Sequence, residues 1–264
     1  MIKKLIKNSI EWVSPELMFK ISLWRKGKYE REVDILKYLI QPSRMAIDIG
    51  ANIGYYTYHM LKYTDKIMVF EPNPLPAAKL RRLFGTKARI EQVALSDKSD
   101  KITMYIPMRA GQMIHMLGSV DLNNPVRNDN DAHALEVAAR RLDDYQLENV
   151  GFIKIDVEGH ELAVLKGAYE LLTRDRPSLL IEAEERHRPG AVKSICELLT
   201  KLDYRGFFII KDEIRPMIDF DPGVYQNPAN DSAEAKAEGK NYINNFIFIS
   251  RQEILAAIPH DLRS

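Results

Sequence analysis

Short apolar runs and segments with helical spacing alternate along most of the chain. Apolar runs of strand length cover 44–50, 65–72, 88–97, 101–107, 150–159, 177–185, 205–212 and 242–250. Apolar residues spaced as on one helical face cover 2–13, 29–40, 53–63, 73–84, 160–176 and 190–203. This order predicts repeated strand–helix–strand units.

Such units favour a mostly parallel sheet, because right-handed crossovers place helices on both of its faces. The last two strands are joined by 214–241, which has no convincing helical pattern, so we expect them to pair antiparallel. The prediction is an α/β fold: a Rossmann-like, doubly wound sheet of seven strands, mostly parallel with an antiparallel last strand, plus N-terminal helices. Residues 1–40 are expected to form a helical extension packed on a core domain of 41–264, and 101–107 an additional strand.

Composition narrows the class of protein. Hydrophobic residues make up 45% of the 264 residues and charged residues 28%, as in ordinary globular proteins. A net charge of +1 gives no broad nucleic-acid surface, so no nucleic-acid partner is expected. No apolar run approaches the roughly 20 residues that span a bilayer. The basic N-terminus lacks the apolar core of a secretory signal, so we expect a cytoplasmic protein.

Two further segments, 2–13 and 108–140, lie outside the strand–helix pattern of the core or interrupt it. The amphipathic pattern of 2–13 predicts a helix docked on the protein, with peripheral membrane contact or a substrate lid as alternatives. Residues 108–140 look irregular and polar. We expect the methionines in and beside this segment to build an acceptor pocket: Met104, Met108, Met113 and Met116.

A strand, a glycine turn and a helix meet at 45–60. Asp48, Gly50, Asn52 and Gly54 form the pattern D-x-G-x-N-x-G, which is typical of a cofactor-binding loop. A dehydrogenase loop has three glycines, and the carboxylate of Asp48 would repel a pyrophosphate. It would attract a cationic amino-acid head group, which S-adenosylmethionine carries.

Polar residues at other strand ends extend this prediction. Glu71 ends the second strand, where a carboxylate can accept hydrogen bonds from both ribose hydroxyls. Asp97 follows the third strand and could bind the adenine amine, or simply cap its own turn. Asn244 and Asn245 interrupt the apolar last strand and need partners, so they are further candidates.

The segments that carry these residues resemble the FkbM family of methyltransferases, which have the class I S-adenosylmethionine-dependent fold. The resemblance lies in "IDIGANIGYYT", "VFEPNP", "FIKIDVEGHELAVLKGA", "LLIEAEE" and "NNFIFIS". It implies that the first two segments hold S-adenosylmethionine. It also implies an O-methyltransferase that acts on a hydroxyl of a sugar, glycan or glycosylated small molecule.

Acids follow the ends of two neighbouring predicted strands. Asp156 ends one strand, with Glu158 and His160 directly after it, and Glu182 ends the next. Ligands of open α/β sheets bind beyond these ends, so all four are candidates to orient the acceptor hydroxyl or remove its proton. Asp156 is the first candidate, whereas His160 suits a base but could instead cap the following helix.

Other readings stay open. The segment after Asp156 lacks the second histidine of H-E-x-x-H, so no metal is predicted, although a hard cation could bridge Asp156 and a diol. The alternatives in function are an N-methyltransferase of a small molecule and a non-catalytic S-adenosylmethionine-binding protein. The remaining histidines that we considered are expected to face solvent: His59, His115, His133 and His187.

Overall fold

A computed structural model describes residues 19, 30–109, 112–113, 118–120, 132–232, 234 and 241–259. The predicted helix at 2–13 lies outside these residues, as do His115 and Met116. Within the described residues no helix is both long enough and apolar enough to cross a membrane.

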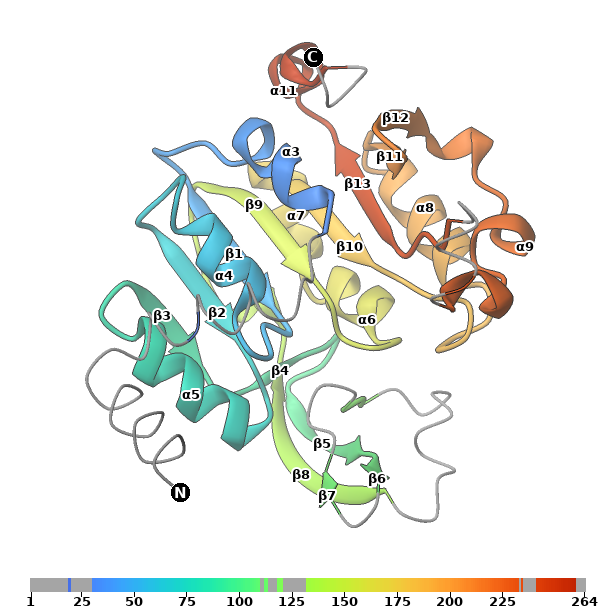
Figure 1. Ribbon diagram of the computed structural model, residues 1–264. Coiled ribbons are helices and arrows are strands. Elements are labelled where there is room, and N and C mark those ends of the chain that lie inside the picture. The colour runs from blue at the N-terminus through green and yellow to red at the C-terminus, as the bar shows by residue number, and fades with distance from the viewer. Residues whose placement is uncertain are drawn as a thin grey trace, which may run out of the picture.

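The main sheet has the predicted doubly wound architecture (Figure 1). Its strands β3, β2, β1, β9 and β10 run parallel, and β13 pairs antiparallel with both β10 and β11. An eighth strand, β12, extends the sheet as the hairpin partner of β11. In spatial order the strands are β12 (Glu213–Pro216), β11 (Arg205–Ile210), β13 (Asn245–Ile249), β10 (Ser178–Glu182), β9 (Val150–Ile155), β1 (Met45–Ile49), β2 (Ile67–Phe70) and β3 (Ala88–Glu91).

Helices cover both faces of this sheet. One face packs against α3 (Glu32–Leu39), α4 (Tyr55–Met60), α5 (Pro74–Phe84) and α11 (Gln252–Ala257). The other packs against α6 (Glu161–Lys166), α7 (Tyr169–Asp175) and α8 (Ala191–Thr200). The single helix predicted at 160–176 is therefore two helices. Gly167 lies at the break, where a Cβ would come within 1.9 Å of the Ser96 carbonyl oxygen.

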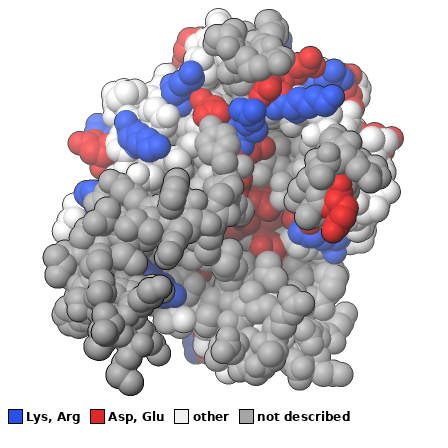
Figure 2. All heavy atoms as spheres, in the orientation of Figure 1, with Lys and Arg blue, Asp and Glu red and all other residues white. Residues whose placement is uncertain are grey.

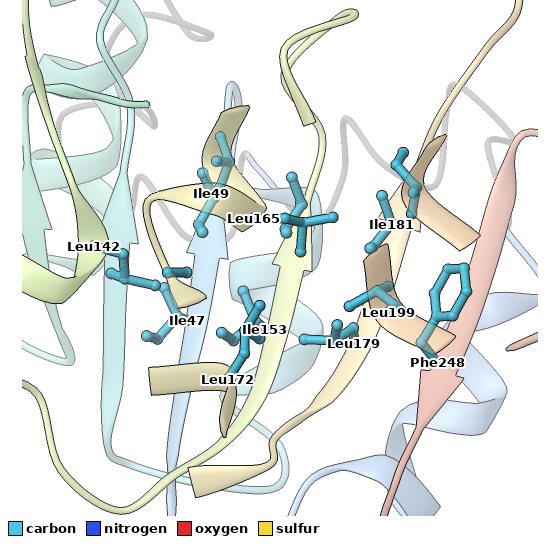
Figure 3. Packing of buried hydrophobic residues seen from close by; sticks show 14 of the residues in the cluster. Ile47, Ile49, Leu142, Ile153, Leu165, Leu172, Leu179, Ile181, Leu199 and Phe248 are labelled. Carbon is cyan, nitrogen blue, oxygen red and sulfur yellow. The ribbon is translucent and has the colours of Figure 1, made fainter. Parts of the chain in front are cut away.

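The core explains why the central strands are apolar on both sides. Ile47 and Ile153 point from neighbouring strands toward the α7 side, where they pack with Leu172 in one buried cluster (Figure 3). Their neighbours in sequence, such as Phe152, pack on the opposite face under α3 and α4. Burying each such side chain stabilises the fold by about 1.5–3 kcal/mol. Lys154 of β9 is a polar residue in this region with a fully buried side chain, and Asp48 of β1 is buried almost as completely.

A second, small sheet lies beyond the carboxyl ends of the main strands (Figure 1). It contains β4 (Ala94–Leu95), β8 (His133–Arg140) and β5 (Asp100–Ile106), and a hairpin of β6 (Met108–Arg109) and β7 (Gln112–Met113) follows β5. The expectation that 108–140 is irregular was therefore wrong, because it contains β8. The predicted third strand also divides: β3 joins the main sheet and β4 the small one.

Short elements fill the remaining connections. The turn η3 (Leu142–Tyr145) precedes β9, and the loop predicted at 214–241 begins within β12. That loop continues through η4 (Met217–Asp219), α9 (Pro222–Tyr225) and η5 (Pro228–Asp231).

Candidate active site

A cavity of about 590 Å³ lies at the carboxyl ends of β1, β2 and β9. The loop after β1 lines it with Gly50 and Asn52, and Glu71 enters from the end of β2. The small sheet closes it from below, with Met104 among the lining side chains. Met104, which we expected in an acceptor pocket, contributes to the cavity at the glycine loop.

The carboxylate of Glu71 is fixed in this cavity by two backbone amides. The Asn52 N–H donates to Oε2 and the Asn73 N–H donates to Oε1, each at 2.8 Å. Burial raises the pKa of Glu71 to about 7, although the two amide bonds oppose this shift. Each oxygen keeps a lone pair, so the group can still accept hydrogen bonds from a diol.

Both glycines of the loop are required by close packing. Gly50 has φ +78°, and a Cβ there would lie 1.8 Å from the Asp156 carbonyl oxygen. Gly54 has φ +85°, and its Cβ would lie 2.5 Å from Cε2 of Phe84. Gly50 therefore brings β9 against the loop, whereas Gly54 lets α4 begin directly against α5.

Asp48 lies behind the loop and does not line the cavity. It is almost completely buried and accepts a 2.5 Å hydrogen bond from the Thr57 hydroxyl of α4. Burial raises the pKa of Asp48 to about 6, an effect that Thr57 and the nearby Lys154 reduce. The expectation that Asp48 faces the cationic end of a cofactor does not match this position; its contact with α4 holds the loop instead.

Asp97 is also placed away from the cavity. Its side chain is exposed and accepts a 3.3 Å hydrogen bond from the Ser96 hydroxyl. The apolar residues shortly before it, Val93, Ala94 and Leu95, line the cavity instead. The local turn role that we left open for Asp97 therefore fits the structure better.

A second, narrow cavity, open to solvent, is lined mainly by acids. Asp156 and Glu158 line both cavities, so the two adjoin at the end of β9. Figure 2 shows acidic side chains gathered in a hollow near the middle of the visible face. The complete lining is Asp156, Glu158, Glu161, Glu182, Ala183, Glu184 and His187.

Two of these acids have structural partners. Glu161 Oε1 accepts the Gly159 N–H at 2.8 Å and so stabilises the turn after β9. Glu184 is almost fully buried, and its carboxylate pairs with Arg186 at 2.6 Å and accepts the Tyr242 hydroxyl. These bonds engage Glu184 and one oxygen of Glu161 with the fold itself, whereas Glu161 Oε2 is buried with no hydrogen-bond partner among the described residues.

Asp156, Glu158 and Glu182 also line the cavity, and Glu158 and Glu182 have partners there of their own. Burial raises the pKa of Glu158 and of Glu182 well above the usual range, and the nearby Asp156 carboxylate adds to both shifts. Within the described residues no hydrogen-bond donor contacts the Asp156 carboxylate. Asp156, Glu158 and Glu182 therefore come together as the sequence predicted, with acceptor capacity directed toward the cavity.

Lys154 supplies a buried positive charge beneath this group. Its Nζ lies 3.1 Å from the Asn245 Oδ1 and 3.9 Å from Glu182 Oε2, and 4.8 Å over the Tyr56 ring. Asn244 donates to Glu182 Oε1 at 2.6 Å. Asn245, the first residue of β13, and Asn244 directly before it thus have partners at the site, as the sequence indicated.

His133 is exposed as expected, whereas His59 is half-buried and His187 is mostly shielded from solvent. His160 lines neither cavity; its Nε2 lies 2.9 Å from the Ser96 hydroxyl, at the start of α6. His187, which we expected in solvent, has a side chain only 17% exposed, with Nε2 at 3.2 Å from Glu158 Oε2. Its position five residues after the last residue of β10, at the edge that carries Asp156, is the signal that could have identified it.

No group of three or more potential metal ligands among the described residues is arranged to hold a metal ion. The cation that could bridge Asp156 and a diol therefore gains no support from these side chains.

The doubly wound sheet, the glycine loop and the acids at the strand ends define a class I methyltransferase fold. The chain belongs to the FkbM methyltransferase family, since the family model described as "Methyltransferase FkbM domain" matches residues 48–207. The cofactor of this family is S-adenosylmethionine. The Glu71 carboxylate, which two backbone amides hold at the open cavity beside the glycine loop, is positioned for the ribose diol of that molecule.

Individual relatives agree with this family. The chain is 31% identical over 159 residues to "2-O-methyltransferase NoeI" of Sinorhizobium fredii, a match over 54% of this chain and 64% of that protein. It is 30% identical over 141 residues to "Methyltransferase 1" of Beauveria bassiana, over 46% of this chain and 57% of that protein. The matches thus span less than two thirds of either relative.

A solved structure supports the fold. The crystal structure of "Methyltransferase FkbM" from Methylobacillus flagellatus aligns with a TM-score of 0.50 at 16% identity, over 79% of this chain and 44% of that one.

Proposed function

We propose that this protein is an S-adenosylmethionine-dependent O-methyltransferase that acts on a hydroxyl of a sugar, glycan or glycosylated small molecule. The observation that carries the proposal is the carboxylate group of Asp156, Glu158 and Glu182, which adjoins the cofactor cavity. Carboxylates accept hydrogen bonds from several hydroxyls at once, so this cavity suits a polyol. The relative named as a 2-O-methyltransferase supports the same reaction type.

The cofactor site is assigned to the larger cavity. Glu71 accepts hydrogen bonds from the ribose hydroxyls. Asn52 lines the same cavity, and its backbone N–H donates to Glu71 and so orients the carboxylate. Gly50 and Gly54 set the path of the loop, and Asp48 supports it from behind. S-adenosylmethionine, when bound, supplies a methyl group on a positively charged sulfur.

The chain's own residues would position the acceptor oxygen beside that methyl group. Correct alignment alone can contribute roughly 7–11 kcal/mol to lowering the barrier. Asp156 and Glu182 would accept hydrogen bonds from neighbouring hydroxyls and so fix which oxygen is presented. The gathering of acidic side chains in this cavity disfavours phosphate-bearing acceptors, which argues against nucleic acids as substrates.

The experiment is methyl transfer from tritium-labelled S-adenosylmethionine to a panel of methyl glycosides of glucose, galactose, mannose, fucose and rhamnose, with glucosamine as an amine control. Label in a neutral glycoside, with a new methyl ether in its mass and NMR spectra, supports the proposal. Label only on the glucosamine nitrogen would instead indicate an N-methyltransferase. Binding of S-adenosylmethionine with no transfer to any glycoside would contradict the proposed acceptor class.

A further inference from the structure

His187 lies in the acid-lined cavity and has no role in the function described so far. It belongs to the turn between β10 and α8, and its side chain is mostly shielded from solvent. The same cavity holds Asp156 and Glu158, which also line the cofactor cavity. His187 therefore contacts Glu158, a residue that lines both cavities at the place where cofactor and acceptor would meet.

The contact with Glu158 fixes the imidazole ring. His187 Nε2 lies 3.2 Å from Glu158 Oε2. Glu158 is itself held in an uncommon backbone conformation, with φ +54°, and its carbonyl oxygen accepts a 2.6 Å hydrogen bond from the hydroxyl of Ser119, which forms a bridge with Tyr105 of β5. Strained non-glycine residues persist where the surrounding structure requires them, often at functional sites.

We propose that His187 is the general base that takes the proton of the acceptor hydroxyl, and that Glu158 orients its ring. This inference rests on the proposed O-methyltransferase function. An acid that holds one imidazole nitrogen while the other receives a proton is a recurring arrangement in enzymes. When the Glu158 carboxylate is ionised and accepts the Nε2–H, Nδ1 is the nitrogen that receives the proton.

The ionisation state of the ring suits this role. Burial lowers the pKa of His187, an effect that Arg186 supports and that Glu184 and Asp156 oppose. The ring is therefore neutral at pH 7 and can accept a proton. The charged and titratable groups that face it are Asp156, Glu158, Glu161, Glu182, Glu184 and Arg186.

The step balances as a single displacement. The acceptor oxygen forms its bond to the methyl carbon while the bond from that carbon to sulfur breaks, and the sulfur keeps the electron pair. The hydroxyl proton passes to His187 Nδ1 and is later released to water. The products are a methyl ether, S-adenosylhomocysteine and one proton.

His160 is a weaker candidate for the same task. Its Nε2 is engaged by the Ser96 hydroxyl at 2.9 Å, and it lines neither cavity. The two histidines therefore differ in their partners: His160 contacts Ser96 outside both cavities, whereas His187 contacts Glu158 within the acid-lined one.

The first arm of the test does not need an acceptor. Long-range ¹H–¹⁵N spectra of the full chain, saturated with S-adenosylhomocysteine, would follow each histidine ring from pH 5 to 9, with His187→Gln used to assign its signals. We expect a neutral His187 at pH 7, protonated on Nε2, and a changed tautomer ratio in Glu158→Gln. A His187 that is doubly protonated at pH 7, or unaffected by Glu158→Gln, would overturn the proposal.

The second arm uses whichever glycoside the wild-type protein methylates. His187→Gln is expected to lower kcat by about 100- to 10,000-fold, the contribution typical of a general base, with the affinity for S-adenosylhomocysteine unchanged. The control is His133→Gln, at an exposed residue of β8, which should keep full activity. Wild-type kcat in His187→Gln would refute the base assignment. If the wild type methylates no glycoside, the proposed function fails, and the spectra still decide the state of His187.

Discussion

The buried ammonium group of Lys154 should be essential to the stability of the acid-rich site. Its Nζ lies 3.9 Å from Glu182 Oε2, with the side chain 1% exposed. Two unit charges at about 4 Å attract by roughly 4 kcal/mol at an effective dielectric constant near 20. Removing one partner of a buried pair typically costs about 3–5 kcal/mol.

The substitution Lys154→Met keeps the length of the side chain and removes its charge. We expect it to reduce the free energy of unfolding by about 2–4 kcal/mol at pH 8. This loss is somewhat smaller than the typical cost of removing one partner of a buried ion pair, because Glu182 can respond by taking up a proton. The matched control is Lys62→Met at an exposed site on the surface, which should change stability by less than about 0.5 kcal/mol.

The destabilisation by Lys154→Met should depend on pH in a definite direction. The pKa of Asp48 in the folded protein is raised to about 6, above its ordinary value of 3.8, so its ionised form opposes folding at higher pH. Lys154 reduces this opposition, so its loss raises the pKa of Asp48 further. The destabilisation by Lys154→Met should therefore be largest at pH 8 and shrink as the pH falls below about 6.

Urea unfolding of both variants and the wild type at pH 8 and pH 5.5 measures these differences. A loss below about 1 kcal/mol at pH 8 would show that the charge of Lys154 is not needed. An equal loss at both pH values would show that only packing was disturbed, and the electrostatic reasoning would be refuted.

Three further predictions concern the cofactor cavity. Hydroxyls that donate to Glu71 favour its ionised form, so S-adenosylhomocysteine binding at pH 7 should release about half a proton, measurable by calorimetry in two buffers and absent in Glu71→Gln. Gly50→Ala should destabilise the protein by at least about 3 kcal/mol in urea, because its Cβ would meet the Asp156 carbonyl in a strained backbone; a stable variant would contradict the loop geometry. Gly118→Ala places a Cβ 2.4 Å from Cε of Met104 and should weaken S-adenosylhomocysteine binding about ten-fold, with recovery when Met104→Ala is added; unchanged binding would exclude Met104 from the site.

Local patterns predicted most of the sheet because burial on both faces leaves a clear apolar run, as in β1 and β9. They missed β8, whose alanine-rich sequence has weak strand propensity and whose role depends on pairing with β5. They also missed the break at Gly167, which is caused by the distant Ser96 carbonyl. Contacts between residues far apart in sequence decide both features.

The candidate site divides in the same way. Glu71 and Asp156 follow directly from their positions at strand ends. Asp48 was placed correctly in the motif, but its direction toward Thr57 depends on how α4 packs. His187 could not be ranked above His160, because its contact with Glu158 joins two turns that are far apart in sequence.

The central claim is that the cavity beside the glycine loop binds S-adenosylmethionine through Glu71. The most direct test is calorimetric titration of the full chain with S-adenosylhomocysteine, beside Glu71→Ala and NAD as a control ligand. The account predicts saturable binding at one site in the wild type, at least ten-fold weaker binding in Glu71→Ala and none of NAD. Equal affinity in the wild type and in Glu71→Ala, or no binding by the folded wild type, would contradict it.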